Sequence, residues 1–282
     1  MRRSTLVDAA GPGDPELVGR DNFRCLSESL RIDPSWRVLD FGCGFGRTSV
    51  PLAEFLAGGH VVGVDIVPEE IELCRSVIAP RFPNTSFICT DASNRNFDWR
   101  IKGSVRDSEA EFFNKHAASF DLIVAFSVFT HFDPGMARRY ISLLRSVAKP
   151  GGYLFLTWFF DHDDNPPEWR LDSSETFRET GDLHFVAFSR SYFDRIVGGA
   201  ELRTIRVSFG TWRGPSGFEC LGQHYQDVAI LQRPVELPAD FDADRYLQLN
   251  PDVAQAGVDA VSHYLHYGYR EGRLFRADTG YV

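Results

Sequence analysis

Residues 38–47 read Val38-Leu39-Asp40-Phe41-Gly42-Cys43-Gly44-Phe45-Gly46-Arg47. An apolar run reaches an acid, Asp40, and three glycines at alternate positions then lead into a segment with a helical pattern. This order predicts a strand that ends in a sharp turn and continues into a helix. A ligand can approach such a turn closely, because glycine has no Cβ and the helix start offers free N–H groups.

Strand-like and helical segments alternate on both sides of this turn. Seven apolar runs are expected to be strands, at residues 36–41, 61–64, 86–89, 121–126, 153–160, 202–209 and 227–231. Helices are expected at residues 16–30, 47–57, 68–78, 133–148 and 189–197. The alternation predicts an α/β fold with a doubly wound, mostly parallel seven-stranded sheet that carries helices on both faces.

Polar residues close four of the expected strands, and they are Asp40, Asp65, Asp91 and Ser127. Because parallel strands point the same way, all four should lie along one edge of the sheet. Ligands of doubly wound sheets bind beyond the carboxyl ends of the strands. We therefore expect the binding site at this edge.

The acid at position 65 follows the glycines by about 20 residues, where a carboxylate can take both ribose hydroxyls of a nucleotide. That spacing fits NAD as well as S-adenosylmethionine. Three features favour S-adenosylmethionine: the glycines are spaced GxGxG, Asp40 precedes them by two residues, and Asp91 closes the third strand. A carboxylate beside the turn repels a pyrophosphate, whereas it attracts a sulfonium or an ammonium group.

Residues 36–160 resemble the class I S-adenosylmethionine-dependent methyltransferases. Six motifs carry the resemblance in order: residues 38–46, Gly63-Val64-Asp65-Ile66, Cys89-Thr90-Asp91-Ala92, Phe120-Asp121-Leu122-Ile123, Ser127-Val128-Phe129-Thr130-His131-Phe132 and Ala148-Lys149-Pro150-Gly151-Gly152. The resemblance implies a methyl transferase that uses S-adenosylmethionine. A Rossmann-type NAD enzyme, or a relative that has lost catalysis, stays open as an alternative.

The resemblance also implies which residues meet the cofactor. The implied contacts are the methionine part with Asp40, Gly42, Cys43, Gly44 and Gly46, the ribose with Asp65, the adenine with Ile66, Asp91 and Ala92, and the sulfonium side with Phe126 and Ser127. In relatives a stretch like residues 19–23 folds over the cofactor from the N-terminal side. An ordinary amphipathic helix is the alternative for that stretch.

Three histidines are candidate bases, because an alcohol acceptor must lose its proton during methyl transfer. His131 follows the fourth strand on the ligand edge, although a histidine is common there in the family and so favours a structural or cofactor-side role. His162 and His184 lie in outer segments. The cluster at residues 161–164 could bind a divalent cation through oxygen ligands. Its spacing matches no metal signature, and we expect no metal site.

Three units are expected along the chain. They are an N-terminal arm and cap helix at residues 1–35, a methyltransferase domain at 36–233 and a small helical module at 239–277. Within the second unit we expect an inserted surface loop at residues 93–118 and a polar, aromatic lid at about 161–188. Aromatic side chains are dense in the outer segments, where core packing and stacking on a sugar ring are both open.

The module is similar to a short unit found on bacterial glycosyltransferases. The similarity rests on the pattern Tyr246-Leu247, Asn250-Pro251-Asp252-Val253-Ala254, His263-Tyr264, Gly268 and Glu271-Gly272-Arg273. The methyltransferase part also resembles proteins of surface-polysaccharide clusters. These resemblances imply a sugar hydroxyl or glycan intermediate as the acceptor and a glycan-assembly protein as a partner. A non-carbohydrate small-molecule acceptor, a non-catalytic scaffold and a plain helical cap remain alternatives.

Composition narrows the classes of protein. The chain has 282 residues, a net charge of −9 and no dense run of Lys and Arg, which argues against a nucleic-acid partner. No apolar run is long enough to span a bilayer, and no apolar stretch of a signal peptide follows Met1. The five cysteines form no CxxC pair, which favours reduced thiols in a cytoplasmic protein.

Overall fold

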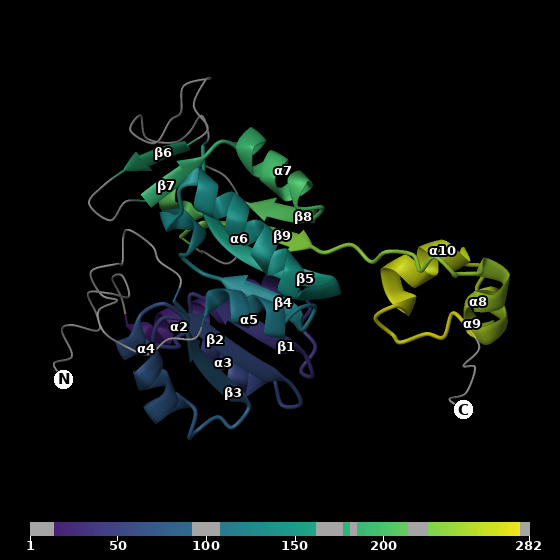
Figure 1. Ribbon diagram of the computed structural model, residues 1–282, viewed down its shortest axis with the longest axis horizontal. Helices are drawn as coiled ribbons and strands as arrows, with labels where there is room; N and C mark the ends of the chain where they lie inside the picture. The colour runs from purple at the N-terminus through teal and green to yellow at the C-terminus, as the bar shows by residue number, and fades with distance from the viewer. Residues whose placement is uncertain (1–13, 92–107, 162–176, 181–184, 214–224, 277–282) are drawn as a thin grey trace.

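The computed structural model describes residues 14–91, 108–161, 177–180, 185–213 and 225–276 (Figure 1). Its centre is a sheet in the order β3-β2-β1-β4-β5-β9-β8. The strands of this order are β1 Arg37–Phe41, β2 His60–Asp65, β3 Thr85–Cys89, β4 Phe120–Ala125, β5 Ala148–Phe160, β8 Arg203–Ser208 and β9 Asp227–Gln232. The first five strands of that order pair in parallel, and β9 pairs antiparallel with both β5 and β8. The predicted doubly wound, mostly parallel seven-stranded sheet is confirmed.

Two further strands extend the sheet at the carboxyl end of β5. They are β6 Phe177–Thr180 and β7 Phe185–Phe188, which pair antiparallel with each other. Phe159 and Phe160 of β5 pair in parallel with β7. The lid expected at about residues 161–188 stays a prediction, because residues 162–176 and 181–184 lie outside the described residues and residues 177–180 and 185–188 are described only as strands β6 and β7. β7 pairs with the last two residues of β5 because β5 runs past the end of β9.

Helices cover both faces of the sheet. Their bounds are α2 Pro15–Ser29, α3 Ser49–Phe55, α4 Pro68–Leu73, η1 Cys74–Ile78, α5 Glu109–Lys115, α6 Pro134–Val147 and α7 Arg190–Gly199, with short 3₁₀ turns η3 Phe129–His131 and η5 Thr211–Arg213. Side chains alternate along a strand, so Leu39 packs with α5, α6 and α7 whereas Val38 packs with α2 and α3. Asp40 shares the face of Val38, which places its carboxylate beside α3.

Local sequence explains where several helices begin. Asp133 accepts a hydrogen bond from the Met136 backbone N–H at 2.9 Å, and Pro134 takes the first helical position of α6. Helix α5 contradicts the expected surface loop at residues 93–118. Ser108 caps it, and Phe112 and Phe113 are buried against the core. Two aromatic side chains in one turn outweigh the polar flanks that suggested a loop.

The C-terminal helices form a separate small core. Their bounds are α8 Ala243–Leu249, α9 Pro251–Gln255, α10 Ala260–His263 and η7 Tyr264–Gly268. Figure 1 shows them beside the sheet, joined to the end of β9 by an extended segment. Arg270 reaches back to the sheet, where its guanidinium lies 5.1 Å from the Trp36 ring and 4.7 Å from the Tyr153 ring. Both rings lie at the amino end of the sheet, opposite the expected ligand edge.

The described residues also bear on the expectations for membrane spans and cysteines. Within the described ranges, no helix is long and apolar enough to cross a membrane. Cys25, Cys43, Cys74 and Cys89 are buried and form no disulfide with one another, and Cys220 lies outside the described residues.

Candidate functional site

The glycine turn at the end of β1 is built from left-handed backbone. Gly42, Gly44 and Gly46 have φ angles of 73°, 55° and 86°. A Cβ on Gly46 would lie 2.4 Å from Ile78 Cδ1, so that glycine is needed for packing against η1. A Cβ on Gly44 would meet only a carboxylate oxygen of Glu70, at 3.2 Å, among the described atoms within 4 Å. Gly44 is therefore the glycine whose backbone a ligand can approach.

Asp65 ties this turn to the end of β2. Its Oδ2 accepts a hydrogen bond from the Gly44 backbone N–H at 2.8 Å, and its Oδ1 accepts one from the Val67 N–H at 2.9 Å. A carboxylate oxygen has more than one acceptor direction. Asp65 can hold the turn and still accept hydrogen bonds from a ligand's hydroxyl groups. The half-buried Ile66 follows it directly.

Asp40 is a buried carboxyl behind the turn, with only 2% of its surface exposed. The Ser49 hydroxyl donates a hydrogen bond to its Oδ2 at 2.6 Å. Burial raises the pKa of Asp40 to about 6, although the Ser49 hydrogen bond and the Arg47 guanidinium act in the opposite direction. Burial therefore opposes ionisation of Asp40, and the positive charge of Arg47 offsets part of that effect.

Glu70 is a site residue that the sequence reasoning missed. It is 6% exposed, and it occupies the third position of α4, one turn beyond Asp65. Burial lowers the pKa of Arg47, while the nearby carboxylates of Asp40 and Glu70 raise it. The sequence could have indicated Glu70, because a helix that starts at Pro68, just after Asp65, has its first turn beside the glycine turn. The positive charge of Arg47 offsets part of the negative charge expected at this site. The carboxyl groups of Asp40, Asp65 and Glu70 still outnumber that one guanidinium, so the site suits a cationic ligand better than a diphosphate.

Ser127, two residues past the end of β4, has strained backbone. Ser127 has a φ of 57°, which is uncommon for a residue with a side chain. Its backbone N–H donates to the Thr157 hydroxyl at 2.7 Å, and its own hydroxyl donates to Gln226 Oε1 at 3.1 Å. Phe126 beside it is buried against Phe155. The local sequence gave no signal for Thr157 and Gln226, because they lie 30 and 99 residues from Ser127.

The remaining predicted cofactor residues, Asp91, Cys43 and Ala92, differ in exposure and in whether the structure describes them. Asp91 is exposed, and its Oδ1 accepts a hydrogen bond from the Glu109 N–H at 2.7 Å at the start of α5. The Cys43 side chain is buried and faces Cys74 and Gly63, so only its backbone belongs to the turn. Ala92 lies outside the described residues.

His131 is the one candidate base that lies within the described residues, since His162 and His184 fall outside them. It ends the 3₁₀ turn η3 after β4, and its ring centroid lies 5.1 Å from that of Phe185 on β7. Phe185 also contacts Phe159, which in turn contacts Trp212 and Tyr225. These five rings, which we call the aromatic wall, line the carboxyl end of β5.

Other outer aromatics are part of the core. Trp158, Phe160 and Phe193 are at most 1% exposed and pack against one another. By contrast, 60% of the Tyr225 surface is exposed. The structure thus separates packing aromatics from those that a ligand can reach.

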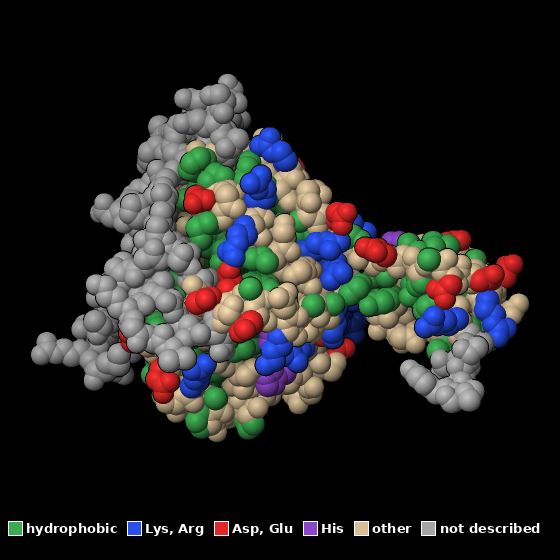
Figure 2. All heavy atoms as spheres, viewed as in Figure 1, with side chains coloured by type: hydrophobic (Ala, Val, Ile, Leu, Met, Phe, Trp, Pro, Cys, Tyr) green, Lys and Arg blue, Asp and Glu red, His purple; other side chains and the backbone are tan. Residues whose placement is uncertain are grey.

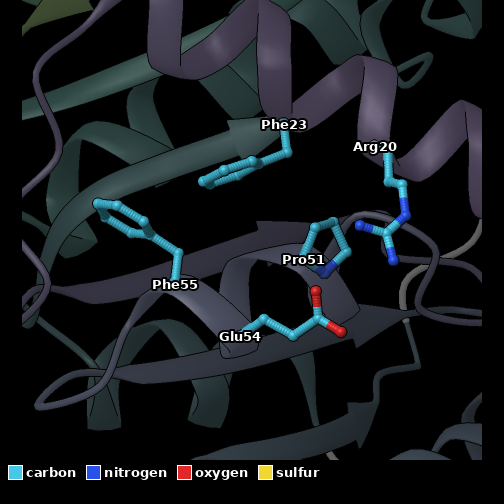
Figure 3. A pocket seen from close by; sticks show the side chains of 5 residues that line it. All are labelled: Arg20, Phe23, Pro51, Glu54 and Phe55. Carbon is cyan, nitrogen blue, oxygen red and sulfur yellow. The ribbon is translucent and has the colours of Figure 1, made fainter.

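Helix α2 packs directly against the turn side of α3. A Cβ on Gly19 would lie 2.1 Å from the Arg47 carbonyl oxygen, and Asn22 Nδ2 donates to the Thr48 hydroxyl at 2.9 Å. A groove of about 380 Å³ lies between α2 and α3 (Figure 3). Figure 3 shows Phe23 and Phe55 at one end and Arg20 and Glu54 at the other. Residues 19–23 therefore lie next to the glycine turn rather than apart from it.

Metal ligation finds no support in the part of the chain that the structure describes. There, no three His, Cys, Asp or Glu side chains converge as a metal ion would require. Three members of the acidic cluster, residues 162–164, lie outside that part.

Comparisons with known proteins agree with this geometry. Residues 38–152 match the family model described as a methyltransferase domain. The chain is 32% identical over 151 residues to the ubiquinone biosynthesis O-methyltransferase of Xanthomonas axonopodis pv. citri, covering 53% of this chain and 54% of that protein. It is 27% identical over 186 residues to a probable thiol methyltransferase of Arabidopsis thaliana, covering 66% of this chain and 73% of that protein. The chain thus spans about half the length of the first of these relatives.

Two solved structures share the fold. One is the magnesium protoporphyrin IX methyltransferase of Synechocystis PCC 6803 with bound SAH, with a TM-score of 0.51 and 16% identity over 79% of this chain and 90% of that one. The other is the PH0226 protein of Pyrococcus horikoshii OT3, with a TM-score of 0.50 and 18% identity over 76% of this chain and 90% of that one.

Proposed function

We propose that this chain, whose residues 38–152 match a methyltransferase domain, is an S-adenosylmethionine-dependent methyltransferase. The observation that carries the proposal is the glycine turn with its carboxylates. Gly44 offers an approachable backbone, Asp65 anchors it, and Glu70 stands beside it. When bound, S-adenosylmethionine supplies an electrophilic methyl group on a positively charged sulfur. The cationic donor fits a net negative site, and a dinucleotide does not.

The proposed contacts follow the order of the carboxyl edge. Asp65 holds the ribose hydroxyls and Ile66 packs on the adenine, with Asp91 and Ala92 at the adenine edge. The turn from Asp40 to Gly46 lies against the methionine part, and Phe126 and Ser127 line the sulfonium side. In support, Ser127 is held from two sides by Thr157 and Gln226. A residue held this way can position a group at the reacting centre, which is most of what methyl transfer asks of a protein.

We propose a hydroxyl oxygen as the acceptor atom and His131 as the group that removes its proton. His131 stands at the carboxyl edge with one face of its ring against Phe185. The exposed part of the aromatic wall offers Tyr225 as a flat surface for a ring-shaped acceptor. A sugar hydroxyl or glycan intermediate is the acceptor that we favour, because a sugar ring stacks on such a surface and the C-terminal pattern points the same way.

A hydroxyl of a non-carbohydrate small molecule is the second candidate. It is favoured by the name of the Xanthomonas relative, an O-methyltransferase of ubiquinone biosynthesis. Transfer of a labelled methyl group separates the two candidates. Label is expected in extracted surface glycans and sugar intermediates, and label confined to small aromatic metabolites would favour the second candidate.

Calorimetry with the purified chain tests the cofactor. We expect binding of S-adenosylmethionine and of its demethylated product, and none of NAD. Asp65→Ala should weaken this binding at least about tenfold, because the ribose contact and the anchor of the turn are lost together. Asp121→Ala is the matched control at the amino edge, where the carboxylate binds Lys149 and the Arg37 N–H, and it should leave the affinity unchanged. Tight NAD binding without S-adenosylmethionine binding would overturn the proposal.

A non-catalytic scaffold predicts a different pattern. If Asp65→Ala abolished cofactor binding and left the biological role of the protein intact, the chain would act as a scaffold. If His131→Ala kept full turnover, His131 would be excluded as the base.

A further inference from the structure

Helices α6 and α7 carry five arginines, which differ in whether they form an ion pair. Three of them form ion pairs. The pairs are Arg139 with Glu109, Arg145 with Glu201 at 2.7 Å and Arg190 with Asp194 at 2.9 Å. For Arg138 and Arg195, no carboxylate of the described residues lies within the 4.0 Å of an ion pair. In a chain of net charge −9, two arginines without an ion-pair partner among the described residues are unexpected.

The two arginines without a carboxylate line the same groove. It lies between α6 and α7, has a volume of about 320 Å³, and is also lined by Ser142, Tyr192, Ile196 and Gly199. Figure 2 shows Lys and Arg side chains gathered over these two helices on the face in view. A volume near 300 Å³ lies at the lower end of the range for small-ligand sites. The groove is therefore of a size for a small molecule.

Tyr192 holds one of the two guanidinium groups in place. The Arg195 guanidinium lies 5.3 Å from the Tyr192 ring centroid, and that ring stacks on Phe188 at 5.7 Å. The Tyr192 hydroxyl donates a hydrogen bond to the Pro134 carbonyl oxygen in the first turn of α6. Because the ring is fixed at both ends, Arg195 loses less side-chain freedom when it binds an anion.

Arg138 and Arg195 both line the groove beside Tyr192. Burial raises the pKa of Tyr192, Arg138 and Arg195 both oppose that rise, and Asp133 adds to it. Each arginine therefore lies close enough to sense the Tyr192 hydroxyl. Asp133, which accepts the Met136 N–H as the cap of α6, offsets part of the positive charge that the two arginines place near Tyr192.

We propose that the groove between α6 and α7 binds a small oxyanion, a phosphate or a carboxylate, between Arg138 and Arg195. A guanidinium presents a planar fork of N–H donors that matches two oxygens of such a group. An anion in the groove would be attracted by both positive charges. The groove shares no lining residue with the glycine turn or with the Ser127 region, so the proposal does not depend on methyl transfer.

Calorimetry of the full chain at constant ionic strength tests the site, with inorganic pyrophosphate and citrate as the two probes. We expect at least one probe to bind with a Kd of about 1 mM or below. Binding of pyrophosphate alone assigns a phosphate ligand, and binding of citrate alone assigns a carboxylate. Arg138→Gln and Arg195→Gln should each weaken binding about tenfold, and the double variant should abolish it.

Arg145→Gln and Arg190→Gln are the matched controls. Each removes one positive charge from the same helix as its test variant, but at an arginine that already has a carboxylate partner. Their affinity for the probe should stay within about twofold of the parent. Equal weakening in the controls would mean that the probes sense only the overall charge of this face. That result, or a Kd above about 10 mM for both probes, would overturn the proposal.

Discussion

The carboxyl and amino edges of the sheet differ in backbone conformation and in how their carboxyl groups are paired. At the carboxyl edge Ser127 and the glycine turn adopt left-handed backbone, and Asp40 keeps a carboxyl group in a buried position. At the amino edge Asp121 is satisfied by Lys149 at 2.8 Å and by the Arg37 N–H at 2.9 Å. Strain persists where the surrounding structure enforces it, and such places are often functional. We propose that ligand chemistry belongs to the first edge and that the second edge supports the C-terminal helices through Arg270.

The largest expected effect is at the glycine turn. Gly46→Ala places a Cβ 2.4 Å from Ile78 Cδ1 on a backbone with a φ of 86°. We expect a loss of about 3 to 5 kcal/mol in the free energy of unfolding, because overpacking adds to backbone strain. Denaturant titration measures this loss, and calorimetry of the surviving folded protein measures the cofactor affinity.

Gly198→Ala is the matched control for that variant. A Cβ there meets no atom within 4 Å and lies on α7, so alanine should stabilise the helix by about 0.5 to 1 kcal/mol. Equal destabilisation by both variants would remove the distinction between the carboxyl edge and the rest of the fold.

The second expected effect is a pH dependence at Asp40. Burial raises its pKa to about 6 in the folded protein, whereas an unfolded Asp has a pKa of about 3.9. Between these values the folded protein holds a proton that the unfolded chain releases. The resulting stabilisation is fully present below about pH 4 and is lost as the pH rises through about 6. A shift of about two units corresponds to about 3 kcal/mol.

Asp40→Asn tests this effect because it keeps an oxygen that can accept the Ser49 hydroxyl bond and cannot ionise. The free energy of unfolding of the variant, relative to the parent, should rise by about 3 kcal/mol from pH 4 to pH 7.5. Urea titrations at a series of pH values measure the difference. Parallel curves for the two proteins would show that Asp40 ionises without cost.

A smaller effect is expected in the C-terminal helices. The Tyr246 hydroxyl is within 2.8 Å of His263 Nδ1, and the Tyr246 side chain is fully buried. Tyr246→Phe should cost about 1 kcal/mol, the worth of one hydrogen bond, and leave cofactor affinity unchanged. Tyr267→Phe is the control, because Tyr267 is exposed and should change neither quantity. A lower cofactor affinity in Tyr246→Phe would show that the C-terminal helices and the cofactor site are energetically coupled.

The smallest expected effect is at the contact between the sheet and the C-terminal helices. Arg270→Gln removes the cation that lies over Trp36 and Tyr153. We expect a loss of about 0.5 to 1 kcal/mol, a changed Trp36 fluorescence and unchanged methyl transfer. Arg276→Gln, whose ion pair with Asp240 stays within the C-terminal segment, should leave the fluorescence unchanged. A change in turnover with Arg270→Gln would contradict the separation of the two edges.

Local patterns predicted the regular elements of the sheet well. Residues 36–41 and 133–148 match β1 and α6 closely, because an apolar strand run and an Asp-Pro helix start are local signals. The missed elements depend on distant partners. Helix α5 is held by Phe112 and Phe113 packing on the core, and β7 pairs with the part of β5 that extends beyond β9. Neither partner can be read from the segment itself.

The candidate site divides in the same way. The spacing of Gly44 and Asp65 was visible in the chain, and the structure joins them by a 2.8 Å hydrogen bond. The roles of Glu70 beside the turn and of Gln226 beneath Ser127 were not visible. The aromatic wall likewise depends on β7 and β9 meeting the end of β5.

The sequence by itself determined the alternation of strands and helices, the glycine turn and the acids that follow it, because each depends on residues close together in the chain. Only the tertiary structure decided which carboxylates face the turn, that Arg47 offsets part of their charge, and that the C-terminal helices rest on the opposite edge. The physical reason is that burial and charge pairing depend on residues far apart in sequence, which only the packed fold brings together.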